Sequence, residues 1–462
     1  MSSKLFLLSP FSLLLATTIF AADPPGRPHI VFILADDLGY ADVGWHGSEI
    51  KTPNLDKLAN GGAKLEQFYV QPVCSPTRAA FMTGRYPMRH GLQVGVVRPW
   101  AQYGLPLDER TLPLSLKESG YETAITGKWH LGHFQPDYLP TRRGFDHQYG
   151  HYNGALDYFT HIRDEGFDWH KDDKVNRDEG YSTHLLAKEA VRLVRDRDKK
   201  KPFFLYVPFN AVHAPHQVPD KYKEPYAKLA EPRRTYAGML AAMDEAIGQI
   251  VSAIDEAGMR KDTLIVFSSD NGGPQPGKVT NNGNLRAGKA TLYEGGVRVA
   301  ACANWEGVIK AGTVVNEPLH IVDLYPTLLK LAGAKPEQKL PLDGLDAWTT
   351  IADGKRSPHK DILINTTPNN GAIRMGDWKL VINGNRTEDG EPIKGKDKKD
   401  GERVELFNLA KDISEKTNLA TEMPDKVKEL RTRYDELARQ AVTPKSAPKA
   451  KNFVTPKVWG EK

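Results

Sequence analysis

Three continuous apolar runs of strand length lie along the chain, at residues 29–35, 202–208 and 263–269. Runs without alternating polar positions are typical of strands buried on both faces of a parallel sheet. Between the last two runs, apolar residues recur at the spacing of a helix face: Tyr236, Met239, Leu240, Met243, Ile247, Ile250, Val251 and Ile254. This stripe predicts core packing rather than a cofactor site. The order of strand, helix and strand predicts a layered α/β domain.

Two shorter helices are predicted from the residues that open them. Thr52 can cap the first, and Pro53 suits its first helical position. Pro76 opens a second helix that ends at Gly84, so Cys74 lies just before its N-terminus. The backbone N–H groups at that end favour negative charge close to Cys74.

After Gly344 the pattern changes to short strand-like segments at residues 362–365, 378–382 and 404–407, followed by an amphipathic helix over 424–441. Such short strands predict a small C-terminal α+β subdomain with an antiparallel sheet. The predicted organisation is a signal peptide at 1–22, a main catalytic domain at 23–343, a C-terminal subdomain at 344–443 and a tail at 444–462.

The chain has 462 residues, of which 40% are hydrophobic and 26% are charged, a globular composition that is too long for one small core. Lys4 and the apolar stretch that ends at Phe20 have the form of a secretory signal peptide. No later apolar run is long enough to span a membrane. We therefore expect an exported protein, periplasmic or extracellular, without a stable membrane anchor.

The net charge of +5 suits an anionic substrate, and no nucleic-acid partner is expected. Much of the positive excess lies in residues 394–403 and 445–462, which we expect to be solvated loops or ends. The two cysteines, Cys74 and Cys302, are too few for a disulfide-stapled scaffold. One interpretation is that they pair with each other in an oxidising compartment.

Hard oxygen ligands directly follow two of the buried strands. Asp36 and Asp37 come after the first apolar run, and Asp270 and Asn271 come after the last. Ligand sites in open α/β sheets lie outside the carboxyl ends of the strands. Carboxylates that meet there repel one another, and an all-oxygen set suits Ca²⁺ or Mg²⁺ better than Zn²⁺. The alternative is that both pairs only form turns.

Cationic side chains form a second set of candidates. Lys128 and His130 are two residues apart in an extended segment and can face one pocket, with Trp129 packed behind them. His213 follows the run at 202–208, and Lys289 follows a loop rich in Gly and Asn. Each alone is more often a surface or packed residue. Together they supply positive charge for an anionic group and a proton donor.

The hexapeptide Cys74-Ser-Pro-Thr-Arg-Ala79 has a Cys-x-Pro-x-Arg core, and it resembles the signature of type I, formylglycine-dependent sulfatases. The similarity extends from Ile30 to about Asn418. It includes the segments 35–39, 74–84, 128–132, 270–273 and 292–298. Residues 139–145 and 292–298 look closest to arylsulfatase B, the N-acetylgalactosamine-4-sulfatase, and to bacterial carbohydrate sulfatases. Thr77 departs from the Ser of many members, and the low cysteine count favours a bacterial carbohydrate sulfatase.

The resemblance implies the alkaline-phosphatase-like fold, with a large, mixed, mostly parallel sheet between helices. It implies that a formylglycine-generating enzyme oxidises Cys74 to formylglycine, and that the protein removes sulfate from a sulfated carbohydrate of galactosamine or galactose type. It also implies one Ca²⁺, held by Asp36, Asp37, Cys74, Asp270 and Asn271.

The resemblance further implies a role for each cationic residue. One hydroxyl of the hydrated aldehyde attacks sulfur, which gives a covalently sulfated enzyme, and Arg78 stabilises this nucleophile. Lys128, His213 and Lys289 clamp the sulfate, with His213 as the leading candidate for protonating the leaving oxygen. His130 deprotonates the second hydroxyl, so that sulfate is eliminated and the aldehyde is restored.

Residues 149–170 are rich in aromatic residues, His, Asp and Asn, a composition that suits sugar binding. Trp100, Trp169 and His216 are candidate sugar-binding residues, although loop packing explains them equally well. Three other functions compete: a phosphonate monoester hydrolase or phosphodiesterase of the same superfamily, an exported glycan-binding protein without activity, and a cysteine hydrolase. The last combines poorly with an all-oxygen metal site beside Cys74.

Overall fold

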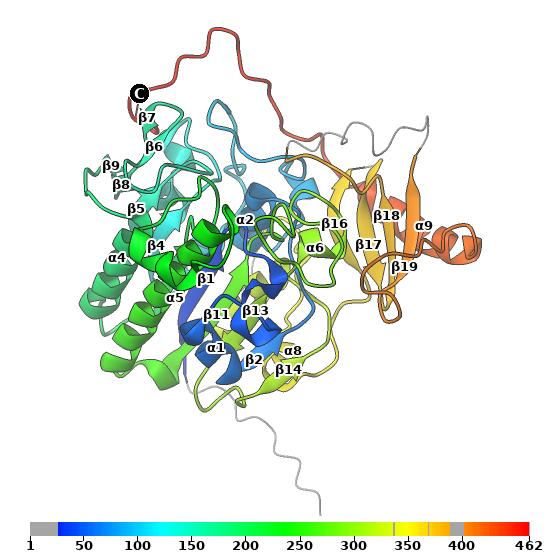
Figure 1. Cartoon of the computed structure of the whole chain (residues 1–462), viewed down its shortest axis with the longest axis horizontal. Coiled ribbons are helices and arrows are strands. Elements are labelled where there is room, and N and C mark those ends of the chain that lie inside the picture. Colours follow the sequence, from blue (N-terminus) through cyan, green and yellow to red (C-terminus); the bar gives the residue numbers. More distant parts are fainter. Residues whose placement is uncertain (1–25, 336–337, 368, 389–401, 462) are drawn as a thin grey trace, which may run out of the picture.

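The computed structural model describes residues 26–335, 338–367, 369–388 and 402–461 (Figure 1). The predicted signal peptide at 1–22 lies outside the described residues, as does most of the basic stretch at 394–403.

The centre of the molecule is a ten-stranded sheet. Its order is β14 (Thr313–Val315), β2 (Ala63–Leu65), β13 (Ala301–Asn304), β11 (Thr263–Ser269), β1 (His29–Ala35), β10 (Phe203–Pro208), β4 (Glu122–Lys128), β5 (His147–His151), β8 (His170–Lys171) and β9 (Lys174–Val175). Neighbouring strands run parallel from β11 to β5. Pairs that include β13 or β8 are antiparallel. The predicted mixed, mostly parallel sheet is confirmed.

Two apolar cores lie on the two faces of this sheet. Alternate residues of β1 point to opposite faces, so Phe32 belongs to one core and Ile33 to the other. One face is covered by α2 (Cys74–Thr83), α3 (Leu112–Glu118) and α7 (Leu324–Leu331), and the other by α1 (Pro53–Asn60), α4 (Ser182–Asp196) and α5 (Arg233–Glu256). Burial on both faces explains why β1, β10 and β11 read as unbroken apolar runs.

Helix α5 carries the predicted apolar stripe and packs beside α4 against the sheet (Figure 1). Within the described part of the chain, it is the one helix long and apolar enough to cross a membrane. Because 72% of that apolar window is buried inside the protein, α5 is accounted for as a core helix.

Helix α2 begins earlier than predicted. Cys74 is its first residue, and the extended residue Val73 precedes it. The prediction that Pro76 opens the helix was wrong, because Pro76 is the third residue of α2. The N–H groups of the first turn of a helix have no intrahelical partners, so proline is tolerated anywhere in that turn without loss of a hydrogen bond.

Smaller elements complete the main domain. They are the sheet of β12 (Arg298–Val299), β3 (Phe68–Tyr69) and β15 (Leu319–His320), the hairpin of β6 (Ile162–Arg163) and β7 (Gly166–Phe167), and helices α6 (Glu294–Val297) and α8 (Trp348–Asp353).

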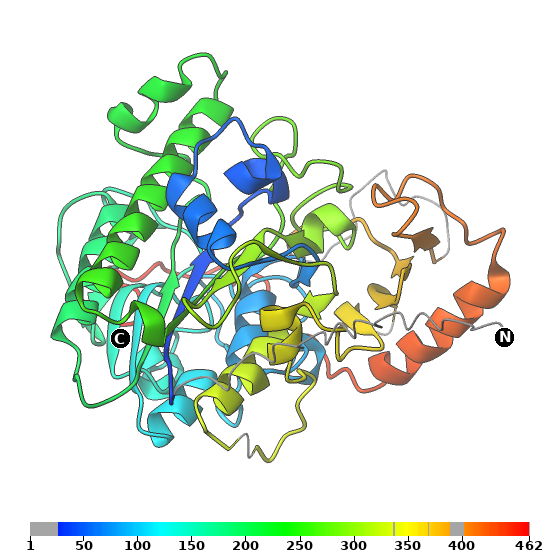
Figure 2. The same cartoon turned by 90° about the horizontal axis from the view of Figure 1, so that it is seen from below.

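The C-terminal part forms a separate antiparallel sheet beside the main domain (Figure 2). Its strands are β16 (Ile362–Thr367), β17 (Asn370–Met375), β18 (Trp378–Ile382) and β19 (Val404–Asn408), and α9 (Pro424–Ala438) packs on the first three. The predicted segments are found, and the structure adds β17. Its opening Asn and Gly are typical of turns, which hid this strand in the sequence.

Residues 442–461 are mostly exposed, as expected of a solvated end, but they contact the main domain. They run back over the main domain, and the C-terminus lies beside β7 (Figure 1). Trp459 is only 2% exposed, because it packs against the β6–β7 hairpin.

A buried charge cluster joins the C-terminal sheet to helix α6. Lys379 of β18 is fully buried, and its Nζ lies 2.8 Å from Glu294 of α6 and 3.0 Å from Glu415. Burial opposes the charge on Glu294, but the ammonium of Lys379 overcomes this and lowers the pKa of Glu294 to about 2. Burial raises the pKa of Glu415 to about 7. One lysine thus pairs with two buried acidic groups between the C-terminal sheet and α6.

We predict that Lys379→Ala lowers the free energy of unfolding by about 3–5 kcal/mol, because it removes the buried ammonium that pairs with both Glu294 and Glu415. Lys330→Ala is the control, since the Lys330 side chain is 72% exposed and pairs with Asp346 on the surface. Its effect should stay below about 1 kcal/mol. Urea unfolding of both variants measures the difference, and equal effects would contradict the role of the cluster.

Candidate active site

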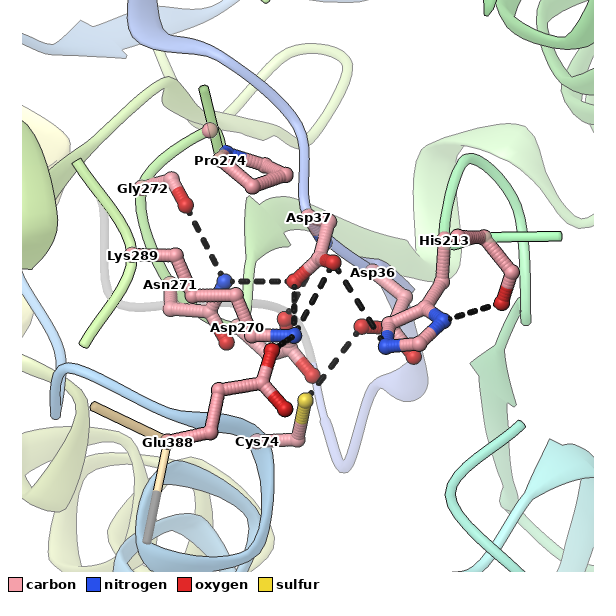
Figure 3. A network of polar contacts seen from close by, with 12 residues as sticks. Asp36, Asp37, Cys74, His213, Asp270, Asn271, Gly272, Pro274, Lys289 and Glu388 are labelled. Carbon is pink, nitrogen blue, oxygen red and sulfur yellow. Dashed lines mark hydrogen bonds and ion pairs between the residues drawn. The ribbon is translucent and has the colours of Figure 1, made fainter. Parts of the chain in front are cut away.

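Strands β1 and β11 are parallel neighbours in register, with Ala35 opposite Ser269. The residues that follow them, Asp36 and Asp270, therefore emerge at the same edge of the sheet. Asp37 turns back through a left-handed backbone conformation (φ 64°), and its backbone N–H donates to Asp270 Oδ1 at 3.3 Å. The carboxylates of the two strands are thus brought into one cluster (Figure 3).

Asn271 completes this cluster. Its side-chain Nδ2 donates to Asp37 Oδ1 at 2.8 Å. Its Oδ1 is buried and has no hydrogen-bond partner among the described residues. A buried acceptor without a donor beside carboxylates fits a cation ligand, because leaving it unpaired costs free energy.

Two cations from distant parts of the chain contact the buried carboxylates. Arg78 of α2 donates to Asp270 Oδ2 from Nε at 3.1 Å and from Nη2 at 2.8 Å. Lys128, at the end of β4, bonds Asp36. Arg78, Lys128 and Asp36 are fully buried. These contacts explain how so much charge is accommodated at the sheet edge.

Lys289 binds the outer part of the cluster. Its Nζ lies 2.9 Å from Asp37 Oδ1 and 2.9 Å from Glu388 Oε1 (Figure 3). Burial opposes the charge on Asp37, but Lys289 and then His213 hold the pKa of Asp37 well below its ordinary value. Asp270 behaves differently, because burial and the nearby Asp36 raise its pKa to about 6.

Cys74 points its Sγ at Asp36 Oδ1, 3.4 Å away. Burial, followed by the charges of Asp270 and Asp36, raises the pKa of Cys74 well above its ordinary value. An unmodified cysteine here is a thiol and a poor nucleophile, which argues against the cysteine-hydrolase alternative. Cys74 and Cys302 are both free, so the predicted disulfide alternative is wrong: Cys302 lies in β13, buried in the core.

The two predicted catalytic histidines line one cavity together with Cys74. His213 Nε2 is 3.5 Å from Asp37 Oδ2, and burial lowers the pKa of His213 to about 4. His130 Nε2 lies 3.0 Å from the carbonyl oxygen of Val97, whereas its Nδ1 is buried without a hydrogen-bond partner in the described structure. Burial, Lys128 and Arg78 hold the pKa of His130 well below its ordinary value.

This cavity has a volume of about 130 Å³. It is lined by Cys74, Val96, Val97, Arg98, Pro99, His130, Gly154, Ala155, Arg163, His213, Lys289 and Glu388. A larger cavity of about 940 Å³ lies between α4 and α5, but it contains none of the predicted catalytic or metal-binding residues. The small cavity is therefore the candidate active site.

Three charged lining residues were not predicted as site residues. Arg98 comes from a loop, Arg163 from β6 of the short hairpin, and Glu388 from the segment that follows β18. No local pattern marks them, because a charged residue in a loop or short hairpin looks the same whether it faces solvent or a pocket.

The candidate sugar-binding residues do not line this cavity. Trp169 is completely buried, and its ring packs edge-on against Tyr149 and stacks on His161. Trp100 Nε1 donates to Ala447 of the tail at 3.0 Å. His216 packs against the ring of Tyr236. The prediction was wrong for Trp169, because a fully buried ring cannot stack on a sugar.

Comparison with known proteins identifies the family. The family model described as Sulfatase matches residues 28–334, a stretch that contains every predicted catalytic and metal-binding residue. The chain belongs to the sulfatase family. It is therefore a sulfuric ester hydrolase with the alkaline-phosphatase-like fold, as the resemblance implied.

Two curated relatives agree with this assignment. Arylsulfatase J of Mus musculus is 40% identical over 479 residues, which cover 94% of this chain and 80% of the relative. N-acetylgalactosamine-6-sulfatase of Mus musculus is 35% identical over 365 residues, which cover 74% of this chain and 69% of the relative.

A solved structure described as Ps i-CgsB in complex with k-i-k-neocarrahexaose has a TM-score of 0.81 and 35% identity, covering 90% of this chain and 94% of that chain. A phosphonate monoester hydrolase of Agrobacterium radiobacter also shares the fold, with a TM-score of 0.61. It is 22% identical and covers 88% of this chain and 96% of its own, which shows the fold alone.

We predict that Trp169→Ala lowers the free energy of unfolding by about 3–5 kcal/mol, because it removes a fully buried ring. The control is Phe159→Ala, whose side chain is 44% exposed, with an expected change within about 0.5 kcal/mol. Denaturant unfolding measures both. A Trp169→Ala protein of unchanged stability would contradict the packing role.

Proposed function

We propose that the protein removes sulfate from a sulfated carbohydrate, using a formylglycine made from Cys74 and one Ca²⁺ held at the carboxylate cluster. The observation that carries this proposal is the position of Cys74. It lies in a Cys-x-Pro-x-Arg segment, 3.4 Å from Asp36, in the same cavity as His130, His213 and Lys289.

Maturation has to precede folding at this segment. Cys74 is 1% exposed, and α2 is buried along its whole length. We propose that a formylglycine-generating enzyme reads this segment while it is still unfolded. A signal peptide at 1–22 would then direct the chain to the periplasm or outside the cell.

The donor set favours a hard cation. Asp36, Asp37, Asp270 and the orphaned Oδ1 of Asn271 offer oxygen ligands, and the atoms of Asp36, Asp37, Cys74 and His213 that could bind a metal lie within 4.8 Å of one another. Oxygen-rich sets of this kind suit Ca²⁺. When bound, the cation would polarise the sulfate and lower the pKa of the nucleophile. We assign His213 to the substrate rather than to the metal, because an imidazole is a poor match for a hard cation.

The hydrated aldehyde of formylglycine would supply two hydroxyls, one to attack sulfur and one to release it. Arg78 is held against Asp270 and Asp36 at the base of the site, where it can stabilise negative charge on the nucleophile. Lys128, Lys289 and His213 would bind the charged oxygens of the ester. Those interactions grow as charge develops on the sulfuryl group.

The histidines divide the proton transfers between them. His130 Nε2 faces a carbonyl oxygen, so that nitrogen carries the proton and Nδ1 keeps its lone pair. We propose Nδ1 as the base that takes a proton from the second hydroxyl. His213 would protonate the leaving oxygen, because an anionic ester beside it raises the pKa of the imidazole toward the range of a proton donor.

The carbohydrate substrate is supported by the relatives. One curated relative is named for N-acetylgalactosamine, and the solved structure at 35% identity is described with a neocarrahexaose. We therefore propose a galactosamine- or galactose-type glycan. Arg98, Arg163 and Glu388 at the cavity wall supply polar groups beyond the sulfate position.

We predict rapid turnover of an aryl sulfate, and turnover of the aryl phosphate with the same leaving group that is slower by about a hundredfold or more. Cys74→Ser should abolish multiple turnover, because one hydroxyl can accept the sulfuryl group but cannot expel it. Rates for both esters, with mass spectrometry of the serine variant, measure this. Preference for the phosphate would favour the phosphonate monoester hydrolase or phosphodiesterase alternative.

A screen of sulfated glycans tests which carbohydrate is the natural substrate. Sulfate release from fragments of sulfated galactans, chondroitin, dermatan and carrageenan should be fast for at least one glycan. Hydrolysis of aryl sulfates alone would contradict the carbohydrate assignment.

We predict that Ca²⁺ stabilises the protein after chelation of bound metal, by about 2.7 kcal/mol at a hundredfold excess over the dissociation constant. Asp37→Ala should lose this increase in Tm together with the activity. Asp220→Ala, at an exposed side chain, should keep both. Thermal unfolding with and without Ca²⁺ measures the effect, and an unchanged Tm of the wild-type protein would contradict a cation site.

A further inference from the structure

Residues 442–459 form a strap, by which we mean the segment that leaves α9 and crosses the main domain to the β6–β7 hairpin (Figure 1). Its first anchor lies beside the loop that leads into the active-site cavity. Gln93 Nε2 donates to the carbonyl of Val442 at 2.8 Å, and Lys445 N donates to the carbonyl of Gly91 at 2.7 Å. A Cβ on Gly91 would lie 2.9 Å from Lys445, so the approach is close.

The second anchor is Trp100. Its Nε1 donates to the carbonyl of Ala447 at 3.0 Å. The ammonium of Lys449 lies 5.8 Å from the centre of the Trp100 ring and 5.4 Å from that of Phe453. The tryptophan that the sequence suggested for sugar stacking is thus engaged by the strap.

The third anchor is Trp459, which is buried against the β6–β7 hairpin. Its Nε1 donates to the carbonyl oxygen of Arg163 at 2.7 Å, and its backbone N–H donates to the carbonyl oxygen of Phe167 at 2.9 Å. A Cβ on Gly166 would lie 2.6 Å from Trp459 Nε1, so only glycine permits this approach. Within residues 442–461, Trp459 is the one residue that is buried. We therefore expect most of the packing of the strap on the main domain to depend on Trp459.

The anchored segments form part of the wall of the active-site cavity. We call residues 96–100 the rim loop and residues 162–167 the rim hairpin. The rim loop places Val96, Val97, Arg98 and Pro99 against the cavity, and the rim hairpin places Arg163 there. The strap is fastened to both segments but is itself absent from the cavity lining.

The inner end of the rim loop has its own support. The backbone N–H of Val97 donates to Ser75 Oγ at 3.0 Å, and its carbonyl bonds His130. These contacts come from α2 and from the turn after β4, so they do not depend on the strap. The outer residues Arg98 and Arg163 lie on the two segments that the strap joins.

We propose that the strap positions the outer wall of the cavity for a sulfated oligosaccharide, with Trp459 as the main positioning residue. This proposal rests on the proposed sulfatase function. A small aryl sulfate needs only the sulfate site around Cys74, whereas an oligosaccharide also reaches the rim. Further sulfate groups on such a chain are anionic, and the rim presents Arg98 and Arg163 to them.

The test compares two substrates in three full-length variants. Trp459→Ala should lower kcat/KM for a sulfated oligosaccharide by about tenfold, mainly through KM, because the rim is no longer held in place before binding. Its kcat/KM for an aryl sulfate should stay within about twofold. Trp459→Phe keeps an aromatic ring at this position and loses the bond to Arg163, so it should show a smaller change in the same direction. Val454→Ala is the matched control, because Val454 lies in the strap with an exposed fraction of 83%.

Loss of oligosaccharide affinity with retained aryl sulfate turnover supports the strap. Equal losses for both substrates, or no loss for either, would overturn it. If Trp459→Ala does not fold, the same comparison in Trp459→Phe decides between these outcomes. Failure of the sulfatase function itself is distinguishable, because the wild-type protein would then hydrolyse neither substrate.

Discussion

Burial of three carboxylates at the ends of two adjacent parallel strands is the constraint on which the site depends. Removing such charges from water costs several kcal/mol for each ion unless partners compensate them. Arg78, Lys128 and Lys289 provide that compensation. These cations come from α2, β4 and a loop before α6. Pairing them with the carboxylates therefore also brings these three segments together around Cys74.

The electrostatics favour the proposed modification of residue 74. The carboxylates that suit a cation also oppose a thiolate, and burial raises the pKa of Cys74 further. The hydrated aldehyde of a formylglycine is neutral before the cation and the ester bind, so it fits this environment better than a thiolate. The carboxylates at the sheet edge, Cys74 at the start of α2 and the three cations therefore form one arrangement.

Much of the fold and site could be predicted because their signals are local. Unbroken apolar runs marked β1, β10 and β11, and the polar residues after two of these strands marked the carboxylate cluster. The proposed modification of Cys74 has no signature in hydropathy or charge, so that part depended on resemblance to a family. The structure brings His130, His213 and Lys289 to one cavity with Cys74. Lys128 does not line that cavity but bonds Asp36 in the carboxylate cluster. Their individual roles stay predictions.

The remaining features are matters of tertiary contact. Aromatic composition around Trp169 looks the same for a sugar platform and for a packed core, and only burial separates the two. The strap is a polar segment held by main-chain contacts and one tryptophan, which no periodicity reveals. Glu388 reaches the cavity from the segment that follows β18.

The most direct measurement is the mass of the peptide that contains residue 74, taken from protein produced with a formylglycine-generating enzyme and compared with its specific activity. We predict that activity rises in proportion to the fraction of aldehyde, in which the lighter oxygen replaces sulfur. Full activity in a preparation in which residue 74 is entirely an unmodified cysteine would contradict the central claim.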